Sequence, residues 1–268
     1  MGNWPHLSVT LSSLRHMRDT DSNKFVAYLA IIATPFALGA FLLTWAPSIQ
    51  YANDDPSGDG YVPPRIIGQL VDRTQESTVT VWCEPTVGKG KQGTAFAIDL
   101  VTDVSKEYPT TLVTNHHVIE GCIGVEHKLT IGLLYQDPVD AVIVKWDEEN
   151  DLAVIATKLE LPSLQLSKYD PYPGYWVMAL GSADGYEGSV SFGNVINTNT
   201  AEILITNNIS HGSSGGPLVD NEGFVVGVTS WGLDIEQYNG AKSLDAFCAK
   251  ILECQYDNGK TWWDYSGD

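Results

Sequence analysis

Basic side chains are scarce in this sequence. Lys and Arg number 15 against 33 Asp and Glu, and charged residues of both signs make up only 18% of the chain. Nucleic acid binding needs clustered Lys and Arg to neutralise phosphates, so the net charge of -18 argues against nucleic acid as a partner. It argues equally against electrostatic attraction to anionic lipid, and it carries no information about the fold.

Cysteine is also sparse, and the four residues stand at positions 83, 122, 248 and 254. No two of them are spaced as C-x-x-C, which argues against a zinc ribbon or a thioredoxin-like redox site. An even number suits two disulfides formed in an oxidising compartment. Four free, buried thiols are the alternative. The sequence shows no internal repeat and no low-complexity tract.

Charge is absent altogether between Phe25 and Asn53. The most apolar part, Phe25–Trp45, has 21 residues, and about 20 suffice to cross a bilayer as a helix. We therefore predict a transmembrane anchor over residues 25–46, preceded by a cytoplasmic segment, 1–24. Basic residues lie before the span and acidic residues after it, which places the rest of the chain outside the cytoplasm. A cleaved signal peptide is the alternative, although its apolar region normally spans about 7–15 residues; the protein would then be secreted.

The remainder predicts a flexible linker, a β-rich domain over residues 64–255 and a tail, 256–268. Residues 47–63 are rich in Pro, Gly, Asp and Ser, as linkers are. Residues 65–75 predict a short helix, and residues 244–254 have the spacing of a second one, with Leu244, Phe247, Cys248, Ile251 and Leu252 on one face. Between them lie short segments rich in Val, Ile, Thr and aromatic residues, which predict the strands of a sandwich or barrel: 77–85, 93–100, 110–119, 128–135, 141–146, 151–157, 176–182, 189–196, 201–207, 216–220 and 223–232.

Three segments carry the residue types that acyl transfer by a serine requires: a nucleophile, an imidazole base, a carboxylate that holds the base, and N–H donors for the oxyanion. Ser214 lies among glycines that permit a tight turn, in which the N–H groups of Gly212 and Ser214 form an oxyanion hole. Two adjacent histidines, His116 and His117, end a predicted strand, and Asp151 begins another. Taken singly, each feature has an ordinary explanation: a Gly/Ser turn, a structural histidine and an acid at a strand start.

Taken together, in the order His, Asp, Ser, these segments resemble the trypsin-like serine proteases, and most closely the high-temperature-requirement (Deg-type) branch. The resemblance covers about residues 64–252. The family's histidine lies three residues after a threonine that ends a strand, as His117 lies after Thr114. Its aspartate sits in a segment like Asn150–Val154, and its nucleophile in Gly-x-Ser-Gly-Gly-Pro, matched by residues 212–217.

The resemblance implies an all-β, chymotrypsin-like domain of two barrels with the active site between them. The catalytic triad would be His117, Asp151 and Ser214, with polypeptide substrates and no metal or cofactor. Substrate would bind through the segment before the nucleophile and through an edge strand that pairs with its main chain. The expected substrate-binding residues are Asn208, Ile209, Ser230, Trp231 and Gly232.

Specificity is expected for cleavage after small or medium apolar residues. Asn208 stands where trypsin has the acid of its primary pocket, and Ile209 offers an aliphatic wall, so a buried Arg or Lys would lack a partner. Asn208 also begins a glycosylation sequon, which we expect to be unmodified because a glycan would obstruct the pocket. Asp234 and Glu236 are the carboxylates that could overturn this expectation.

The resemblance also implies a Cys83–Cys122 disulfide, which would leave Cys248 and Cys254 to pair with each other.

Ser213 departs from the Asp or Asn of many relatives. In trypsin that Asp pairs with an amino group freed by cleavage, so we expect activation here to need no such cleavage. We also expect that the chain lacks the peptide-binding module of many Deg-type proteases, since 36 residues follow Gly232.

Two alternatives to a peptidase stay open from the sequence. The first is a non-catalytic binding or sensor module on a protease fold, although such modules usually lose a member of the triad. The second is an esterase, because the same acyl chemistry hydrolyses esters. The sequence makes no prediction of the oligomeric state.

Overall fold

The computed structural model describes residues 60–100, 102–125, 128–232, 238–248 and 251. The chain divides into two units, Met1–Pro56 and Ser57–Asp268, and all of these residues belong to the second. The predicted anchor, residues 47–59 of the predicted linker, and the tail 256–268 lie outside the described residues. Within the described part of the chain, no helix has both the length and the apolar character needed to span a membrane.

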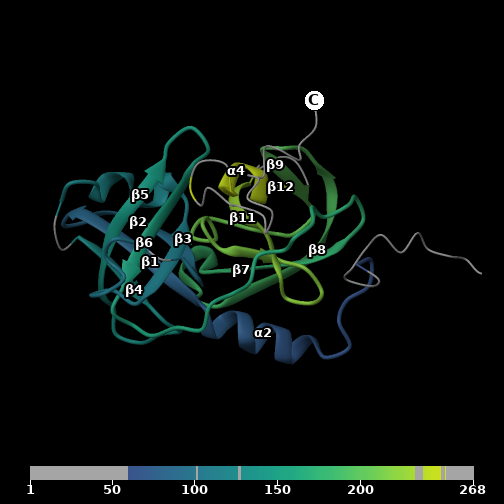
Figure 1. Ribbon diagram of the computed structural model, residues 1–268, viewed down its shortest axis with the longest axis horizontal. Coiled ribbons are helices and arrows are strands. Elements are labelled where there is room, and N and C mark those ends of the chain that lie inside the picture. The colour runs from purple at the N-terminus through teal and green to yellow at the C-terminus, as the bar shows by residue number, and fades with distance from the viewer. Residues whose placement is uncertain (1–59, 101, 126–127, 233–237, 249–250, 252–268) are drawn as a thin grey trace, which may run out of the picture. The chain divides into compact units, whose positions relative to one another are not determined.

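The described strands form two closed six-stranded barrels (Figure 1), which confirms the predicted all-β, two-barrel fold. The first barrel has the order β1-β2-β3-β6-β5-β4: β1 Thr78–Thr86, β2 Lys89–Ile98, β3 Thr110–Thr114, β4 Leu129–Gly132, β5 Val139–Asp147 and β6 Leu152–Thr157. The second has the order β10-β11-β12-β9-β8-β7: β7 Trp176–Gly181, β8 Ser189–Thr198, β9 Glu202–Ile205, β10 Pro217–Val219, β11 Val225–Gly232 and β12 Asn239–Ser243. The strand β12 was not predicted.

Strands β6 and β7 are buried along their whole length because both of their faces meet apolar partners. In β6, Ala153 and Ile155 point into the interior of the first barrel, whereas Leu152 and Val154 point outward into an apolar cluster that the two barrels share. In β7, Val177 and Ala179 fill the second barrel and Trp176 and Met178 join the shared cluster. This two-sided burial explains why both segments are continuously apolar.

The shared cluster fixes the two barrels against each other. Phe96 and Val113 enter it from the first barrel and Val225 and Val228 from the second, all of them fully buried. Burial of a side chain of this size contributes about 1.5–3 kcal/mol. The connection between the barrels adds a short bridge to each of them, at Ile98 and at Val225. The two barrels are therefore joined through one shared apolar cluster and through the segment that connects them.

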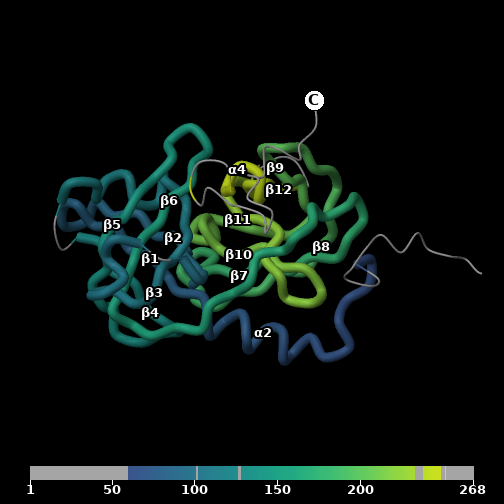
Figure 2. Tube along the Cα trace, in the orientation of Figure 1, coloured from purple at the N-terminus to yellow at the C-terminus, as the bar shows by residue number. Residues whose placement is uncertain are grey.

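The helix α2, Ile67–Glu76, confirms the helix predicted over 65–75 and lies outside the barrels, along the side where β7 and β8 pass (Figure 1 and Figure 2). Its Leu70 is buried in the shared cluster, and Arg73 donates to the carbonyl oxygen of Glu222 at 2.8 Å. The short helix α4, Leu244–Phe247, begins at Ser243, which caps the N–H of Ala246. The predicted apolar face there is buried at Leu244, Phe247, Cys248 and Ile251, and Leu252 lies outside the described residues.

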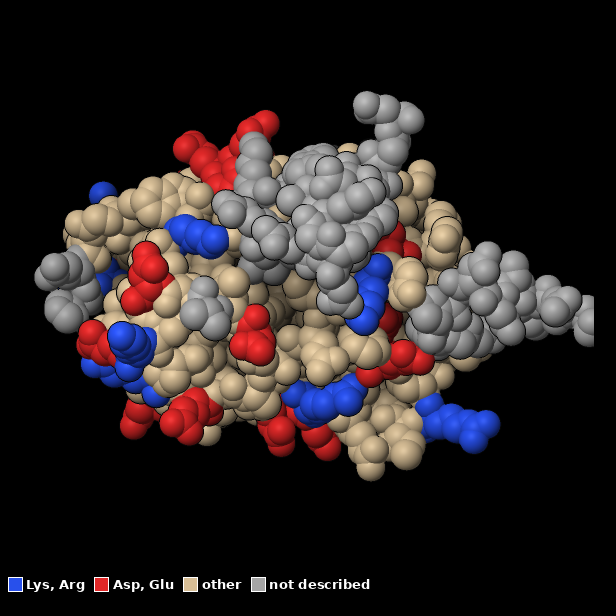
Figure 3. All heavy atoms as spheres, in the orientation of Figure 1, with Lys and Arg blue, Asp and Glu red and all other residues tan. Residues whose placement is uncertain are grey.

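Charged side chains are scattered over the molecular surface. On the face shown in Figure 3, the described acidic and basic groups lie singly or in small groups among uncharged residues. The described charged side chains therefore do not form one large patch of a single sign on this face.

Candidate active site

His117 and Asp151 come together because β3 pairs with β6. Thr114, the last residue of β3, faces Ala153 of β6. The short helix α3, His116–Ile119, starts directly after β3, and Asp151 directly precedes β6. His117 Nδ1 lies 2.8 Å from Asp151 Oδ2 and 3.0 Å from Oδ1, and the backbone N–H of His117 donates to Oδ1 at 2.9 Å. A carboxylate at Nδ1 favours the tautomer with its proton there, which leaves Nε2 free to accept a proton.

Asp151 is held in its charged form. Burial raises the pKa of this carboxyl, but the hydrogen bonds from the side chain and backbone of His117, and one from Ser230 Oγ at 2.9 Å, together lower the pKa below its ordinary value. The backbone of Asp151 is left-handed, with φ of 52°, and Asn115 Nδ2 donates to its carbonyl oxygen at 2.7 Å. The side chain is thus an ionised acceptor in a fixed position.

Ser214 lies in a turn that only glycines can form. Gly212 and Gly215 have φ of +93° and +89°, in the left-handed region. Gly216 has no positive φ, but a Cβ there would lie 2.1 Å from the carbonyl oxygen of Leu180. The Ser214 hydroxyl is half-buried and donates to the carbonyl oxygen of Ser230 at 3.0 Å. No hydrogen bond joins it to His117 within the described residues, and such bonds are often loose before substrate binds.

The N–H groups of Gly212 and Ser214 have no acceptor among the described residues. The carbonyl groups of the same two peptide units are anchored elsewhere. The oxygen of His211 accepts from the N–H of Asp184 at 2.6 Å, and the oxygen of Ser213 accepts from a threonine hydroxyl of β11 at 2.7 Å. Since C=O and N–H point in opposite directions across a trans peptide, both N–H groups are free to bind an external oxygen.

These groups line one open cleft of about 1040 Å³. The structure brings every residue of the predicted substrate site to this cleft together with His117, Gly212 and Ser214: Asn208, Ile209, Ser230, Trp231 and Gly232. Asp151 lies behind His117, with a quarter of its side chain exposed, against 40% for His117. Among the described residues, no cluster of His, Cys, Asp or Glu could hold a metal ion.

Residues 93–228 match the family described as a trypsin-like peptidase domain. The chain belongs to this family. The predicted resemblance to trypsin-like proteases is thereby confirmed, and the matched region spans all three residues predicted for the triad.

Relatives confirm the resemblance to the Deg-type branch. A probable periplasmic serine endoprotease, DegP-like, from Hahella chejuensis is 35% identical over 129 residues, which is 44% of this chain and 27% of the relative. The anti-sigma-I factor RsgI9 of Acetivibrio thermocellus is 33% identical over 139 residues, 49% of this chain and 19% of that protein. The chain therefore spans about a fifth to a quarter of the length of these curated relatives.

The fold is shared with the active form of the Rv3671c protease from M. tuberculosis. The two superpose with a TM-score of 0.58 over 71% of this chain and 86% of the other, at 21% sequence identity. At this identity the likeness concerns the fold alone.

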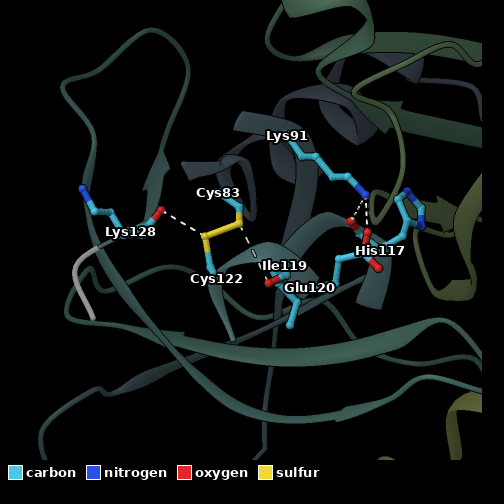
Figure 4. Close-up of a disulfide and its surroundings, with 7 residues drawn as sticks. All are labelled: Cys83, Lys91, His117, Ile119, Glu120, Cys122 and Lys128. Carbon is cyan, nitrogen blue, oxygen red and sulfur yellow. Dashed lines mark hydrogen bonds and ion pairs between the residues drawn. A yellow bond between two sulfur atoms is a disulfide. The ribbon is translucent and has the colours of Figure 1, made fainter. Parts of the chain in front are cut away.

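In this trypsin-like peptidase a disulfide lies beside the histidine helix, as Figure 4 shows. Cys83 of β1 bonds to Cys122, at the end of the 3₁₀ turn η1 (Glu120–Cys122) that follows α3, which confirms the predicted pair. Lys91 forms an ion pair with Glu120 and donates to the carbonyl oxygen of His117 at 3.1 Å. Cys248 is also disulfide-bonded. Cys254 lies outside the described residues, so its pairing with Cys248 stays a prediction.

The structure separates the two adjacent histidines. His117 faces the cleft, whereas His116 is buried, with 8% of its surface exposed, and does not line the cleft. Ser213 is buried behind the nucleophile, where its Oγ accepts from the backbone N–H of Ser210 at 3.4 Å. The register chosen from the sequence, with His117 as the base, is the one that the geometry favours.

Sequence reasoning missed several groups of this cleft. Asn239, on the unpredicted strand β12, faces Gly232 of β11 and anchors its side-chain N–H on the carbonyl oxygen of Asn207 at 2.6 Å. Asp234 and Glu236 lie outside the described residues. No local motif marks the other unpredicted lining residues, which reach the cleft only through the fold: Lys91, Gln92, Val118, Asp184, Gly185, Thr206, Ser210 and His211.

Proposed function

We propose that this chain is a serine endopeptidase that hydrolyses peptide bonds through an acyl-enzyme, with Ser214 as nucleophile, His117 as general base and Asp151 as the carboxylate that orients the base. One observation carries the proposal. A histidine held by a charged carboxylate lies in the same cleft as a serine whose flanking N–H groups are free. Family membership supports the same reaction class.

The chemistry follows from the positions of these groups. Ser214 turns from the carbonyl of Ser230 toward His117, gives its proton to Nε2 and attacks the substrate carbonyl. The developing oxyanion accepts hydrogen bonds from Gly212 and Ser214, each worth about 10²–10³ in rate. Protonated His117, stabilised by Asp151, then passes the proton to the leaving amine. Water then attacks the acyl-enzyme through the same proton transfers and releases the second product.

We further propose the arrangement drawn from the sequence: a cytoplasmic segment 1–24, an anchor 25–46, a linker 47–63, a protease domain 64–255 outside the cytoplasm and a tail 256–268. The disulfide Cys83–Cys122 supports the placement, because such bonds persist in oxidising compartments and are rare in the cytosol. Protease accessibility of the domain in intact cells or spheroplasts tests the placement. A domain that stays protected from added protease until the membrane is broken contradicts it.

Polypeptides cleaved after small or medium apolar residues are the proposed substrates. Asn208 and Ile209 line the cleft without adding a carboxylate to it, and Ile209 packs against the apolar interior of the second barrel. A peptide-library digest tests this preference. Dominant cleavage after Arg or Lys would show that a carboxylate reaches the pocket.

The decisive experiment for the reaction is labelling of the purified protein with a fluorophosphonate, followed by casein hydrolysis. Wild type is expected to label at Ser214 and to cleave casein, and Ser214→Ala to do neither while unfolding at the same temperature. A protein that folds and does not label is a binding module on a protease fold. Labelling with turnover of esters and not of peptides would identify an esterase.

A further inference from the structure

We propose that Glu202 is a positioning residue for substrate recognition, which holds the indole of Trp231 as one wall of the cleft. This wall lies on the side that receives the substrate residues before the scissile bond. The inference rests on the proposed function and deepens it, because it concerns specificity at the same site. Glu202 belongs to β9 and does not itself line the cleft.

The side chain of Trp231 reaches the cleft because β11 has one extra residue against β12. Thr229 faces Ala241 of β12. Two residues further on, Trp231 faces Gly240, so the register shifts by one residue at Ser230. Neighbouring residues of a strand point to opposite faces, and Ala241 belongs to the apolar interior of the second barrel. The shift therefore turns Trp231 outward to the cleft, whereas a regular strand would turn it toward the interior.

The indole lies directly over the backbone of Gly240. A Cβ on this glycine would lie 2.1 Å from Cε2 of the indole and 2.5 Å from its Nε1, so any other residue would displace the ring. Glycine inside a strand often marks such a close approach. Tyr238 meets the same ring edge-on, with 6.5 Å between the ring centroids and 78° between the ring planes.

Glu202 fixes the direction of the indole. Its Oε1 accepts from Trp231 Nε1 at 3.3 Å and from Lys242 Nζ at 2.9 Å. Glu202 faces Lys242 across β9 and β12, which are neighbours in the second barrel (Figure 1). The side chain of Glu202 is 33% exposed and that of Lys242 15%, and salt screens such a partly buried pair less than an exposed one. The indole thus binds a fixed, ionised acceptor, which makes a stronger hydrogen bond than a neutral one.

Trp231 lies beside the proposed pocket. The carbonyl oxygen of Ser230 accepts from the Ser214 hydroxyl, and β11 continues from there along the pocket segment. A Cβ on Gly232 would lie 3.5 Å from the carbonyl oxygen of Ile209. In the proposed function, the substrate residues before the scissile bond pair with this strand. A large aromatic wall beside them favours an apolar residue upstream of the one that enters the pocket.

The first test uses two thiobenzyl esters that end in the same apolar residue. The short ester carries that residue alone, and the long ester carries three further apolar residues before it. In Glu202→Ala, we expect kcat/KM for the long ester to fall about three- to tenfold, as for the loss of one hydrogen bond, and that for the short ester to change less than about twofold. Glu202→Gln keeps an acceptor for the indole and should restore most of the loss. Equal ratios to wild type for the two esters overturn the positioning role, because general damage to the fold does not depend on substrate length.

Two further variants isolate the bond to the indole. Lys242→Met removes the ion pair and keeps the acceptor, so it should lose less kcat/KM for the long ester than Glu202→Ala does. An equal loss would assign the effect to the ion pair. Trp231→Phe keeps an aromatic wall and lacks the N–H donor, so adding Glu202→Ala to it should change nothing further. A further loss as large as that in wild type overturns the link between Glu202 and Trp231.

The second test displaces the indole without touching Glu202. Gly240→Ala puts a Cβ where the ring lies, and it should lower kcat/KM for the long ester at least as much as Glu202→Ala does. Gly68→Ala is the matched control, since a Cβ on this glycine of α2 would meet nothing within 4 Å. A Gly240→Ala variant with the same kcat/KM as the control overturns the role of the wall. This pair also carries the test if Glu202→Ala does not fold.

The outcomes separate the role of Glu202 from the proposed function. If wild type does not label with fluorophosphonate, the proposed function fails before any variant is made. If wild type labels and hydrolyses both esters, while Glu202→Ala changes the two rates by the same factor, the peptidase stands and the role of Glu202 is wrong.

Discussion

The two barrels contribute to the active site in different ways. The first barrel supplies His117 and Asp151, which are joined by side-chain hydrogen bonds, and the Cys83–Cys122 disulfide lies beside them. The second barrel supplies Ser214 and the oxyanion loop, which are shaped by glycines and by bonds to backbone carbonyl groups. The first half of the site therefore depends on the chemistry of individual side chains, and the second half depends on the path of the main chain.

This difference predicts two kinds of sensitivity. In the first barrel, a substitution should matter when it removes a functional group. In the second, a substitution should matter when it adds atoms, because the loop around the nucleophile leaves no space for a Cβ at several positions. Four experiments can break or sharpen the distinction, and they are ordered by the size of the expected effect.

The largest effect is expected for loss of the imidazole in the first barrel. His117→Ala should lower kcat by about 10⁴-fold or more, because the nucleophile loses its base. His116→Ala, which removes the adjacent buried histidine, should keep clear activity. Steady-state hydrolysis of a peptide substrate measures both. Greater loss in His116→Ala would show that the register of the two histidines is reversed.

Adding a methyl group in the second barrel should lower kcat by a somewhat smaller factor than the loss of the imidazole does. A Cβ on Gly212 would lie 2.2 Å from the carbonyl oxygen of Ser182, so Gly212→Ala must displace the oxyanion loop. We expect kcat to fall about 10²–10³-fold, as for loss of an oxyanion donor. Gly88→Ala is the matched control, since Gly88 also has positive φ, at +78°, but its Cβ would meet nothing within 4 Å. A similar loss of kcat in the control would refute the steric explanation.

The disulfide of the first barrel should affect stability more than rate. Cys83→Ala combined with Cys122→Ala opens a covalent loop with a sequence separation of 39, and we expect the free energy of unfolding to fall by about 3 kcal/mol. The kcat of the folded fraction should change less than tenfold, because His117 keeps its two bonds to Asp151. Urea unfolding and active-site titration of the same samples measure the two quantities separately. Unchanged stability with a large loss of kcat would assign the disulfide to positioning.

The smallest effect concerns pH, to which the two regions respond in opposite directions. The lowered pKa of Asp151 means that its stabilisation is present above its unfolded value, about 3.9, and is lost as the pH falls below it. Burial, together with the nearby carboxylate of Asp170, raises the pKa of Asp245 in α4 to about 6. The native state then binds more protons at this group than the unfolded state does, so its contribution to stability falls as the pH rises from about 4 to 6.

Asp245→Asn should therefore stabilise the protein by about 1 kcal/mol at pH 7 and by nothing at pH 4. Urea unfolding at the two pH values measures the difference between variant and wild type. An advantage that does not change with pH would mean that the carboxyl does not titrate between them.

Much of the site could be predicted because its residues stand in short, local patterns. The strands β3 and β6, next to His117 and Asp151, are apolar and rich in β-branched residues, and both are buried along their whole length, which makes them easy to find. The pair Cys83–Cys122 followed from the family resemblance and from no rule of spacing. The membrane anchor stays a prediction, because residues 25–46 lie outside the described part of the chain.

The rest could not be predicted because it depends on contacts between distant segments. The strand β12 reads NGAKS, which has the composition of a turn and becomes a strand only between β11 and β9. The bond from Thr94 to Gly212 joins residues 118 apart, and the bond from Asp184 to His211 involves only backbone atoms. Ser230 was predicted to contact substrate, and its hydroxyl binds Asp151 as well. Local sequence patterns do not reveal these bonds, because the partners are distant in the chain or because the bonding atoms belong to the backbone.

The division of the proposed triad between two barrels has a consequence for biosynthesis. The first barrel is complete at Thr157, when Ser214 has not yet been added to the chain. A nascent chain at that stage holds a base without a nucleophile, and the second barrel alone would hold a nucleophile without a base. By the proposed mechanism, the base and the nucleophile meet only when the two halves close on their shared apolar cluster. Hydrolysis by an unfinished chain is therefore not expected.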